Sequence, residues 1–457
     1  MIRFGFRASP VLHKMSLNNN NTAASASPRS SYNRKVYVVG GKITPFIGKG
    51  HPDFIAKGHP EFGKKTNPSL EEHLQAAVSG CIEETKVNPA LIEKAWIGNF
   101  AGELFSNQGH LGAAVVGTLP DLKYKPVLRV EAACASGGIA FASAVESIQA
   151  GSNVCLVVGA EVQTTVSPRQ GGDYLARASH YIRQRALDDF TFPALFAQRV
   201  KAYTEKYKVA LEDIARVSVK AYGNANKNPL AHMKAVKMDL EGTKASDKNP
   251  AFLKNPELQP FIKTSDCSQV SDGAAALIVV SEEGLKLLGK DKKDAIEVLT
   301  VQVSTGNLWE DADFTVMDTT QAAAMKAFQQ TGLSPNQVQV AEVHDCFAIA
   351  EILMYEAIGW ANPGEGTKLV KEGATNINGR IPVNTGGGLI GFGHPVGATG
   401  IKQVLEVYRQ MKGLCGEYQV PQIPSIGLTA NMGGSDKTSV VSLFANTSSN
   451  DSPRSKY

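Results

Sequence analysis

The sequence predicts an α/β protein built from two domains of like topology. A helical pattern, a proline turn and a short apolar strand occur at residues 69–100 and recur in the same order at 320–343. A glycine-rich segment at 386–400 with a helix through 401–412 then matches an earlier loop and helix at 134–151. A recurrence in fixed order indicates internal duplication, and mixed helical and strand patterns indicate an α/β fold.

The elements of each half follow from their hydrophobic periodicity. Short β-branched or apolar runs predict buried strands, and apolar residues spaced by three or four predict helices. In the first half we expect ordered structure from about Val36, a helix at 69–86 and strands at 95–100, 153–159 and 274–280. In the second half we expect helices at 320–331, 349–358 and 401–412 and strands at 338–343 and 439–444.

The stretch from residue 164 to 268 has a different texture, with more charge, aromatic residues and turn residues. Helical patterns persist in it, so it reads as an inserted lid and not as a linker. The predicted organisation is a leading segment at 1–33, an N-terminal domain at 34–163 plus 269–290, the lid at 164–268, a C-terminal domain at 291–445 and a polar tail at 446–457.

Composition excludes several classes of protein. The longest uninterrupted apolar run is the seven residues from Ala274 to Val280, too short to span a bilayer. The net charge of +4 arises in the first 52 residues, which hold eight basic and no acidic side chains; the remainder has 39 basic and 43 acidic residues. Nucleic-acid binding through a basic surface is therefore not expected. The six cysteines show no metal-site spacing, so no metal site is expected.

Both ends of the chain carry features of targeting signals. The first 30 or so residues are rich in arginine, serine and asparagine and lack acids, which is typical of a mitochondrial presequence. Simple disorder of this segment is the alternative. The chain ends Ser455-Lys456-Tyr457, which approaches the peroxisomal Ser-Lys-Leu signal but has tyrosine in place of leucine. We expect a mitochondrial location, with a peroxisome-type organelle as the alternative.

Cys134 occupies a position that is typical of a catalytic nucleophile, between a predicted strand and a predicted helix. A β-rich run from Val127 enters small residues around the cysteine, and a helical pattern follows to Gly151. A cysteine at a strand-to-helix junction lies near the free N–H groups and the positive dipole of the helix, so we expect a stabilised thiolate. The alternative is a small buried apolar cysteine.

Three further loops have the composition of functional loops: residues 344–347 (His-Asp-Cys-Phe), 393–400 (Gly-His-Pro-Val-Gly-Ala-Thr-Gly) and 431–435 (Asn-Met-Gly-Gly-Ser). His344 and His394 are candidate catalytic residues, and a structural histidine is the alternative for each. The glycines match neither a dinucleotide fingerprint nor a phosphate-binding loop, so nicotinamide and nucleotide-hydrolysis chemistry are not expected.

With these four loops in this order, the chain resembles the thiolase superfamily, and within it the sterol-carrier-protein type thiolases, over roughly residues 34–445. In most thiolases the second loop reads Asn-Glu-Ala-Phe and the fourth carries a catalytic cysteine. Here the fourth loop has none and the second supplies Cys346. The resemblance implies two duplicated βαβαβαββ-type domains packed in α/β/α/β/α layers with an inserted lid.

The resemblance also implies an activity, that of a 3-ketoacyl-CoA thiolase (acetyl-CoA C-acyltransferase) in lipid metabolism, with fatty acid β-oxidation as its setting. Cys134 would attack the ketone and hold the acyl group as a thioester. His394 would accept the Cys134 proton or stabilise the thiolate, and Cys346 would be the acid and base at the acetyl carbon. His394 with the His344 position would form one oxyanion site, and backbone N–H groups at Cys134 and near Gly433 and Gly434 the other.

The ligands implied are CoA thioesters, with free CoA as co-substrate, and no tightly bound cofactor is expected. Ser271, Gly433 and Gly434 are the expected CoA-binding positions. Ser271 matches the family's loop near the pantetheine, and basic residues of the lid should contact the nucleotide. A homodimer is the family expectation.

Two other functions stay open at this point. A decarboxylating condensing enzyme of the ketoacyl-synthase type would use a Cys-His-His set, which Cys134, His344 and His394 could supply. It gives Cys346 no purpose. A non-catalytic acyl-CoA or lipid-binding protein is the alternative from a different class.

Overall fold

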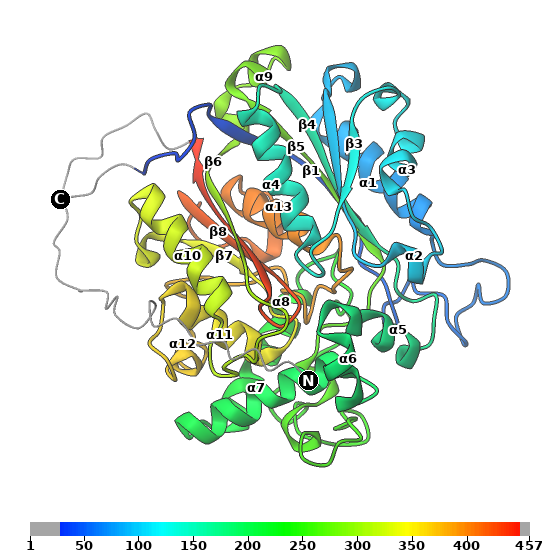
Figure 1. Cartoon of the computed structure of the whole chain (residues 1–457), viewed down its shortest axis with the longest axis vertical. Coiled ribbons are helices and arrows are strands. Elements are labelled where there is room, and N and C mark those ends of the chain that lie inside the picture. The colour runs from blue at the N-terminus through cyan, green and yellow to red at the C-terminus, as the bar shows by residue number, and fades with distance from the viewer. Residues whose placement is uncertain (1–27, 448–457) are drawn as a thin grey trace, which may run out of the picture.

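The computed structural model describes residues 28–447, which form one mixed sheet with helices on both faces (Figure 1). The strands follow the order β3-β2-β4-β5-β1-β6-β9-β8-β7 across the sheet. They are β1 (Val36–Ile43), β2 (Lys94–Gly98), β3 (Val127–Val130), β4 (Val154–Glu161), β5 (Gly273–Ser281), β6 (Ile296–Thr305), β7 (Val340–Val343), β8 (Ile426–Gly433) and β9 (Thr438–Asn446).

The sheet confirms the internal duplication. In the first half, β2 runs parallel to β4, β4 antiparallel to β5, and β5 antiparallel to β1. In the second half, β7, β8, β9 and β6 repeat these relations in the same order. A parallel bridge between Val383 and Ala341 lies where β3 would have its counterpart. The two halves therefore share one topology.

The halves meet edge to edge at β1. Val36 is opposite Ser281 of β5 on one side and Val298 of β6 on the other, both in antiparallel pairing. One continuous nine-stranded sheet thus links the two domains.

The helices arrange these strands in the expected layers. Figure 1 shows α4 and α13 between the two halves of the sheet, α1 and α3 beyond the first half, and α10 and α11 beyond the second. The helices are α1 (Leu70–Thr85), α2 (Gly102–Phe105), α3 (Leu111–Thr118), α4 (Ser136–Gln149), α9 (Glu282–Leu287), α10 (Asp318–Thr331), α11 (Ala348–Ile358), α12 (Gly366–Lys371) and α13 (Thr399–Met411).

Both faces of the central strands are buried, which explains their continuous apolar sequences. In β5, Leu277 and Val279 pack with the central helices, whereas Ile278 and Val280 pack with the cluster under α1. Local signals set the helix limits: Ser69 caps α1 in a reciprocal capping box with Glu72. These elements agree with the expected ones to within a few residues.

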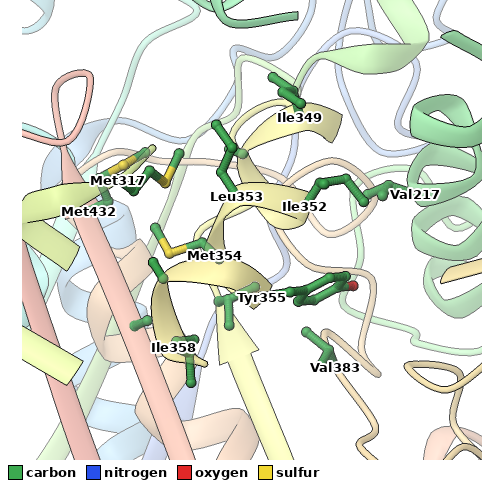
Figure 2. Packing of buried hydrophobic residues seen from close by; sticks show 14 of the residues in the cluster. Val217, Met317, Ile349, Ile352, Leu353, Met354, Tyr355, Ile358, Val383 and Met432 are labelled. Carbon is green, nitrogen blue, oxygen red and sulfur yellow. The ribbon is translucent and has the colours of Figure 1, made fainter. Parts of the chain in front are cut away.

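The insertion forms α5 (Pro168–Leu175), α6 (Tyr181–Gln184), α7 (Thr191–Tyr207) and α8 (Leu211–Ala225). Most of the buried apolar residues of α7 and α8 belong to the same core cluster as the second half of the protein. Figure 2 shows Val217 of α8 beside Ile352 of α11. The insertion is therefore packed onto the C-terminal domain through a shared core.

The leading segment contacts the body before β1 begins. The Arg29 N–H donates to the Thr331 carbonyl and the Ser31 N–H to the Leu299 carbonyl, so part of the segment expected at 1–33 is ordered. The presequence-like residues before position 28 and the Ser455–Tyr457 ending lie outside the described residues. From residue 28 to residue 447, no helix has both the length and the apolar character needed to cross a membrane.

Candidate active site

The structure brings the four predicted catalytic residues together. The Cys134 Sγ, one ring nitrogen of His344 and one of His394 all lie within 4.8 Å of one another. Cys346 is close enough to Cys134 for an unfavourable electrostatic interaction between the two thiolates. Residues as far as 260 positions apart in the chain, Cys134 and His394, meet here because each of the four follows a strand end or precedes a helix.

Cys134 sits in a sharp turn between β3 and α4. Ala133 has a φ of 52°, a left-handed conformation that a residue other than glycine rarely adopts. The Ser136 hydroxyl holds this turn, since it accepts from the Ala132 N–H (3.0 Å) and donates to the Ala133 carbonyl (2.6 Å). The turn presents a half-buried sulfur at the start of α4.

The expectation of a resting Cys134 thiolate is wrong. Burial raises the pKa of the thiol to about 12, although a hydrogen bond from the Gly434 N–H acts in the opposite direction. The free energy that a thiolate loses when it is removed from water is larger than the stabilisation it gains from the N–H groups at the start of the helix. Cys134 therefore rests as a thiol and needs a base.

His394 is the candidate for that base. Its Nδ1 lies 2.6 Å from the Thr399 hydroxyl, which itself donates to the Pro395 carbonyl (3.1 Å). The hydroxyl hydrogen is thus occupied, so Nδ1 carries the proton and Nε2 keeps its lone pair. Burial lowers the pKa of His394 to about 3, so the ring is neutral at rest and its Nε2 carries no proton.

His344 follows β7 and is fully buried. Burial, and then the neighbouring His394, hold the pKa of His344 well below its usual value, so this ring is neutral as well. The two imidazoles meet edge to face with centroids 5.1 Å apart. Among residues 28–447, neither Nε2 has a hydrogen-bond partner, which leaves both free for a reacting group.

Cys346 is buried beside them, and burial raises the pKa of its thiol well above the usual value, so it too rests protonated. The insertion supports its loop from two sides. The Ser268 N–H donates to the Cys346 carbonyl (2.9 Å), and Phe347 stacks on Phe196 of α7 with centroids 4.4 Å apart and planes at 22°.

A cavity of about 400 Å³ opens onto these groups. Cys134, Cys346 and His394 line it, whereas the fully buried His344 does not. Its remaining walls are mainly apolar and come largely from the insertion; they include Phe100, Leu175, Phe190, Phe192, Pro193, Phe252 and Val270. The site therefore combines two thiols and an imidazole with an apolar channel.

The three predicted CoA contacts occupy different positions. Gly434 lines the cavity, with a φ of +65° that suits glycine. Gly433 lies against the Ala132 carbonyl, where any side chain would clash. Ser271 is fully buried; its hydroxyl accepts from the His394 N–H (3.2 Å) and contacts His232 (2.8 Å). That position fits support of His394, and the neighbouring 268–270 line the cavity instead.

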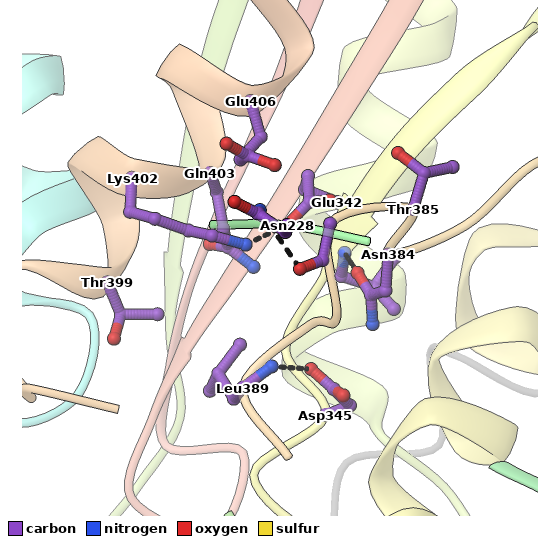
Figure 3. Close-up of polar contacts among 12 residues, drawn as sticks. Asn228, Glu342, Asp345, Asn384, Thr385, Leu389, Thr399, Lys402, Gln403 and Glu406 are labelled. Atoms are coloured by element: carbon purple, nitrogen blue, oxygen red, sulfur yellow. Dashed lines mark hydrogen bonds and ion pairs between the residues drawn. The ribbon is translucent and has the colours of Figure 1, made fainter. Parts of the chain in front are cut away.

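Asp345 supports the site and was not predicted from the motifs. Its carboxylate accepts from the Leu389 N–H (2.6 Å) and the Ile390 N–H (3.4 Å), as Figure 3 shows for Leu389. Gly388 has a φ of +62°, and a Cβ there would clash with this carboxylate. Asp345 thereby ties the His344 loop to the loop that leads to His394. In the sequence, the three consecutive glycines at 386–388 are the feature that indicates a close contact at this loop.

Glu161 was missed as well. It lies at the end of β4 and accepts from the N–H groups of Phe100 (2.9 Å), Ala101 (3.0 Å) and Gly397 (3.2 Å). Burial raises its pKa to about 7, while these hydrogen bonds act to lower it. Glu161 anchors the His394 loop to the first half of the sheet.

Comparison with known proteins agrees with this geometry. The family description "Thiolase, N-terminal domain" matches residues 56–283, and "Thiolase C-terminal domain-like" matches residues 300–446. Acetyl-CoA acetyltransferase of Methanothermobacter thermautotrophicus is 33% identical over 82% of this chain and 94% of its own. Sterol carrier protein 2 of Oryctolagus cuniculus is 29% identical over 87% of this chain and 70% of its own.

The fold has a close match among solved structures. Human mitochondrial 3-ketoacyl-CoA thiolase in complex with CoA superposes with a TM-score of 0.65 at 18% identity, covering 91% of this chain and 98% of that one. At this identity the likeness concerns the fold alone. It confirms the layered architecture expected from the sequence.

Proposed function

The chain belongs to the thiolase family of acyltransferases, and from this premise we propose that it is a 3-ketoacyl-CoA thiolase with free CoA as co-substrate. One observation carries the proposal: Cys134, Cys346 and His394 line the same cavity. A nucleophile, a base for it and a second thiol are the groups that thiolysis requires.

The first half-reaction breaks the bond between C2 and C3 of the substrate. His394 Nε2 takes the Cys134 proton as the sulfur attacks the C3 ketone, and the acyl group stays on Cys134 as a thioester. The departing acetyl-CoA enolate takes its proton at C2 from the Cys346 thiol, whose raised pKa keeps it protonated until the enolate forms. The Gly434 N–H, aimed at Cys134, is placed to stabilise an oxyanion there.

The second half-reaction restores the enzyme. The Cys346 thiolate takes the proton of the CoA thiol, and the CoA sulfur attacks the Cys134 thioester. The shortened acyl-CoA leaves, and the Cys134 sulfur recovers its proton from His394. Every proton moved in the first half-reaction is thereby returned.

We further propose that the acyl chain is longer than the acetoacetyl group. Phe190, Phe192 and Phe252 of the insertion form apolar walls beyond the two cysteines. An acetoacetyl group would leave these walls uncovered, whereas a longer chain would gain from their burial.

The test is the cleavage of acetoacetyl-CoA and longer 3-ketoacyl-CoA with free CoA by wild type, Cys134→Ala and Cys346→Ala. We expect turnover by wild type, loss of most activity in both variants, and a mass increase on Cys134 when substrate is added without CoA. Full activity in Cys346→Ala would remove its acid and base role.

A condensation assay with a malonyl donor and a measurement of CoA-ester binding separate the alternatives. Condensation that requires a malonyl donor would indicate the ketoacyl-synthase type. An inert wild type that still binds CoA esters would indicate a binding protein.

We also propose a homodimer and a mitochondrial location, with a peroxisome-type organelle as the alternative. The composition of the first 30 or so residues, rich in arginine, serine and asparagine and free of acids, supports the location. Light scattering should give twice the chain mass of 48.7 kDa. Antibody detection of the untagged chain in organelle fractions tests the location, because a tag at either end could mask a signal.

A further inference from the structure

Asn431 occupies a position in β8 that is built around its side chain. The residue is 2% exposed and sits between the starts of α4 and α13. A Cβ at Gly138 of α4 or at Gly400 of α13 would clash with the Asn431 Oδ1. Two glycines from two helices thus leave room for this amide beside the catalytic residues.

The contacts determine which way the amide points. The Gly138 N–H donates to Asn431 Oδ1 (3.1 Å), so this atom must be the oxygen. The nitrogen Nδ2 then donates to the Cys134 carbonyl (3.1 Å) and lies 3.2 Å from His344 Nδ1. An amide nitrogen can only donate, so His344 Nδ1 must accept and the ring proton must be on Nε2.

We propose that Asn431 is a positioning residue that holds His344 in the Nε2–H form and so makes it a hydrogen-bond donor to the charge that develops beside Cys134. Thr399 holds His394 in the opposite form, with a free lone pair on Nε2. One imidazole near the sulfur therefore accepts a proton while the other donates a hydrogen bond. The kinetic part of this inference rests on the proposed thiolase activity.

The other tautomer of His344 would leave the site without this pairing of one proton acceptor and one hydrogen-bond donor. With the proton on Nδ1, both histidines would present lone pairs toward the Cys134 thiol. No side-chain donor would then remain for the negative charge. Asn431→Asp creates this state with little change in shape, because a carboxylate accepts the Nδ1 proton and still accepts from the Gly138 N–H. It also loses the hydrogen bond to the Cys134 carbonyl, an effect that does not depend on His344.

The experiment compares Asn431→Asp in two backgrounds, wild type and His344→Asn. An asparagine at position 344 can donate through its own amide and has no tautomer to be set. We expect kcat for thiolysis to fall by about 100-fold in the wild-type background, the order of one lost oxyanion donor, with the KM for CoA changed less than about twofold. In the His344→Asn background the fall should stay below about fivefold. Asn431→Leu, which adds no charge, should also lower kcat in the wild-type background only.

Equal falls in both backgrounds would overturn the proposal, since Asn431 would then act through Cys134. A kcat that Asn431→Asp leaves unchanged in the wild-type background would overturn it too. Nitrogen NMR of histidine-labelled protein gives a readout that needs no activity, with the His344 signals assigned by their loss in His344→Asn. A proton on Nε2 in the native chain, moving to Nδ1 in Asn431→Asp, supports the proposal even if wild type cleaves no thioester. A proton on Nδ1 in the native chain refutes it.

Discussion

Replacing Phe196 by alanine should damage catalysis and not only stability. Phe196 lies in α7 of the insertion, is fully buried, and stacks on Phe347 at a centroid distance of 4.4 Å. Phe347 directly follows Cys346, and both line the cavity. The stack therefore connects the insertion to the proposed acid and base.

The size of the effect follows from burial and position. Removing a fully buried phenylalanine side chain costs about 3–5 kcal/mol in unfolding free energy. Release of Phe347 should also let the Cys346 sulfur move, and a displacement of about 1 Å can cost about 100-fold in rate. We expect kcat to fall at least about tenfold.

Phe444→Ala is the matched control. Phe444 is also fully buried, but it lies in β9 and packs against Phe141 in the central helical layer, toward the end of the strand away from Gly433. Denaturant midpoints should fall similarly in both variants, whereas kcat, measured well below each melting temperature, should fall in Phe196→Ala alone. Equal kcat values would refute the claim that the stack positions Cys346.

Three further outcomes are expected. The kcat/KM should rise about fourfold per methylene from acetoacetyl-CoA upward until the cavity is filled, because each buried methylene contributes about 0.8 kcal/mol; a flat series would oppose the apolar-channel assignment. Iodoacetamide modification of Cys134, followed by peptide mass spectrometry, should speed up about tenfold per pH unit between pH 6 and 9, because its pKa of about 12 keeps the thiolate a minor species; a plateau would indicate a resting thiolate. Lys402→Met should lower the free energy of unfolding by about 3–5 kcal/mol, because the buried Lys402 Nζ lies 2.7 Å from Glu342 Oε2 and its removal leaves a buried carboxylate without a partner (Figure 3). Burial already raises the pKa of Glu342 to about 7, above its unfolded value, so the loss should be larger at pH 8 than at pH 6 in denaturant titrations.

Much of the fold could be predicted from the sequence because the signals are local. The buried strands are short apolar runs, and the helix at 70–85 has its capping box written in Ser69 and Glu72. Cys134, His344, Cys346 and His394 stand in loops of unusual composition, so they could be found one at a time.

The rest depends on contacts between distant parts of the chain. The protonation state expected for Cys134 is wrong because a strand-to-helix junction can be read from the sequence, whereas the burial of the sulfur in the assembled fold cannot. Three supporting residues form hydrogen bonds to loops that are distant in the sequence: Asp345, Glu161 and Asn431. The residues next to each of them in the sequence do not indicate which loop it contacts. The pairing of β1 with β6 is likewise a property of the assembled sheet.

That pairing has a consequence for how the chain is made. Val36 emerges early from the ribosome, but its partner in β6, Val298, is synthesised near the end of the first two thirds of the chain. At about 5–20 residues per second, roughly 15–60 s separate the start of synthesis from the arrival of β6. Through that interval the apolar strand β1 has neither of its native neighbours for most of the time, because β5 arrives only shortly before β6. A nascent chain with such an unpaired strand is a natural client for chaperones, and its folding rate should be limited by this long-range closure.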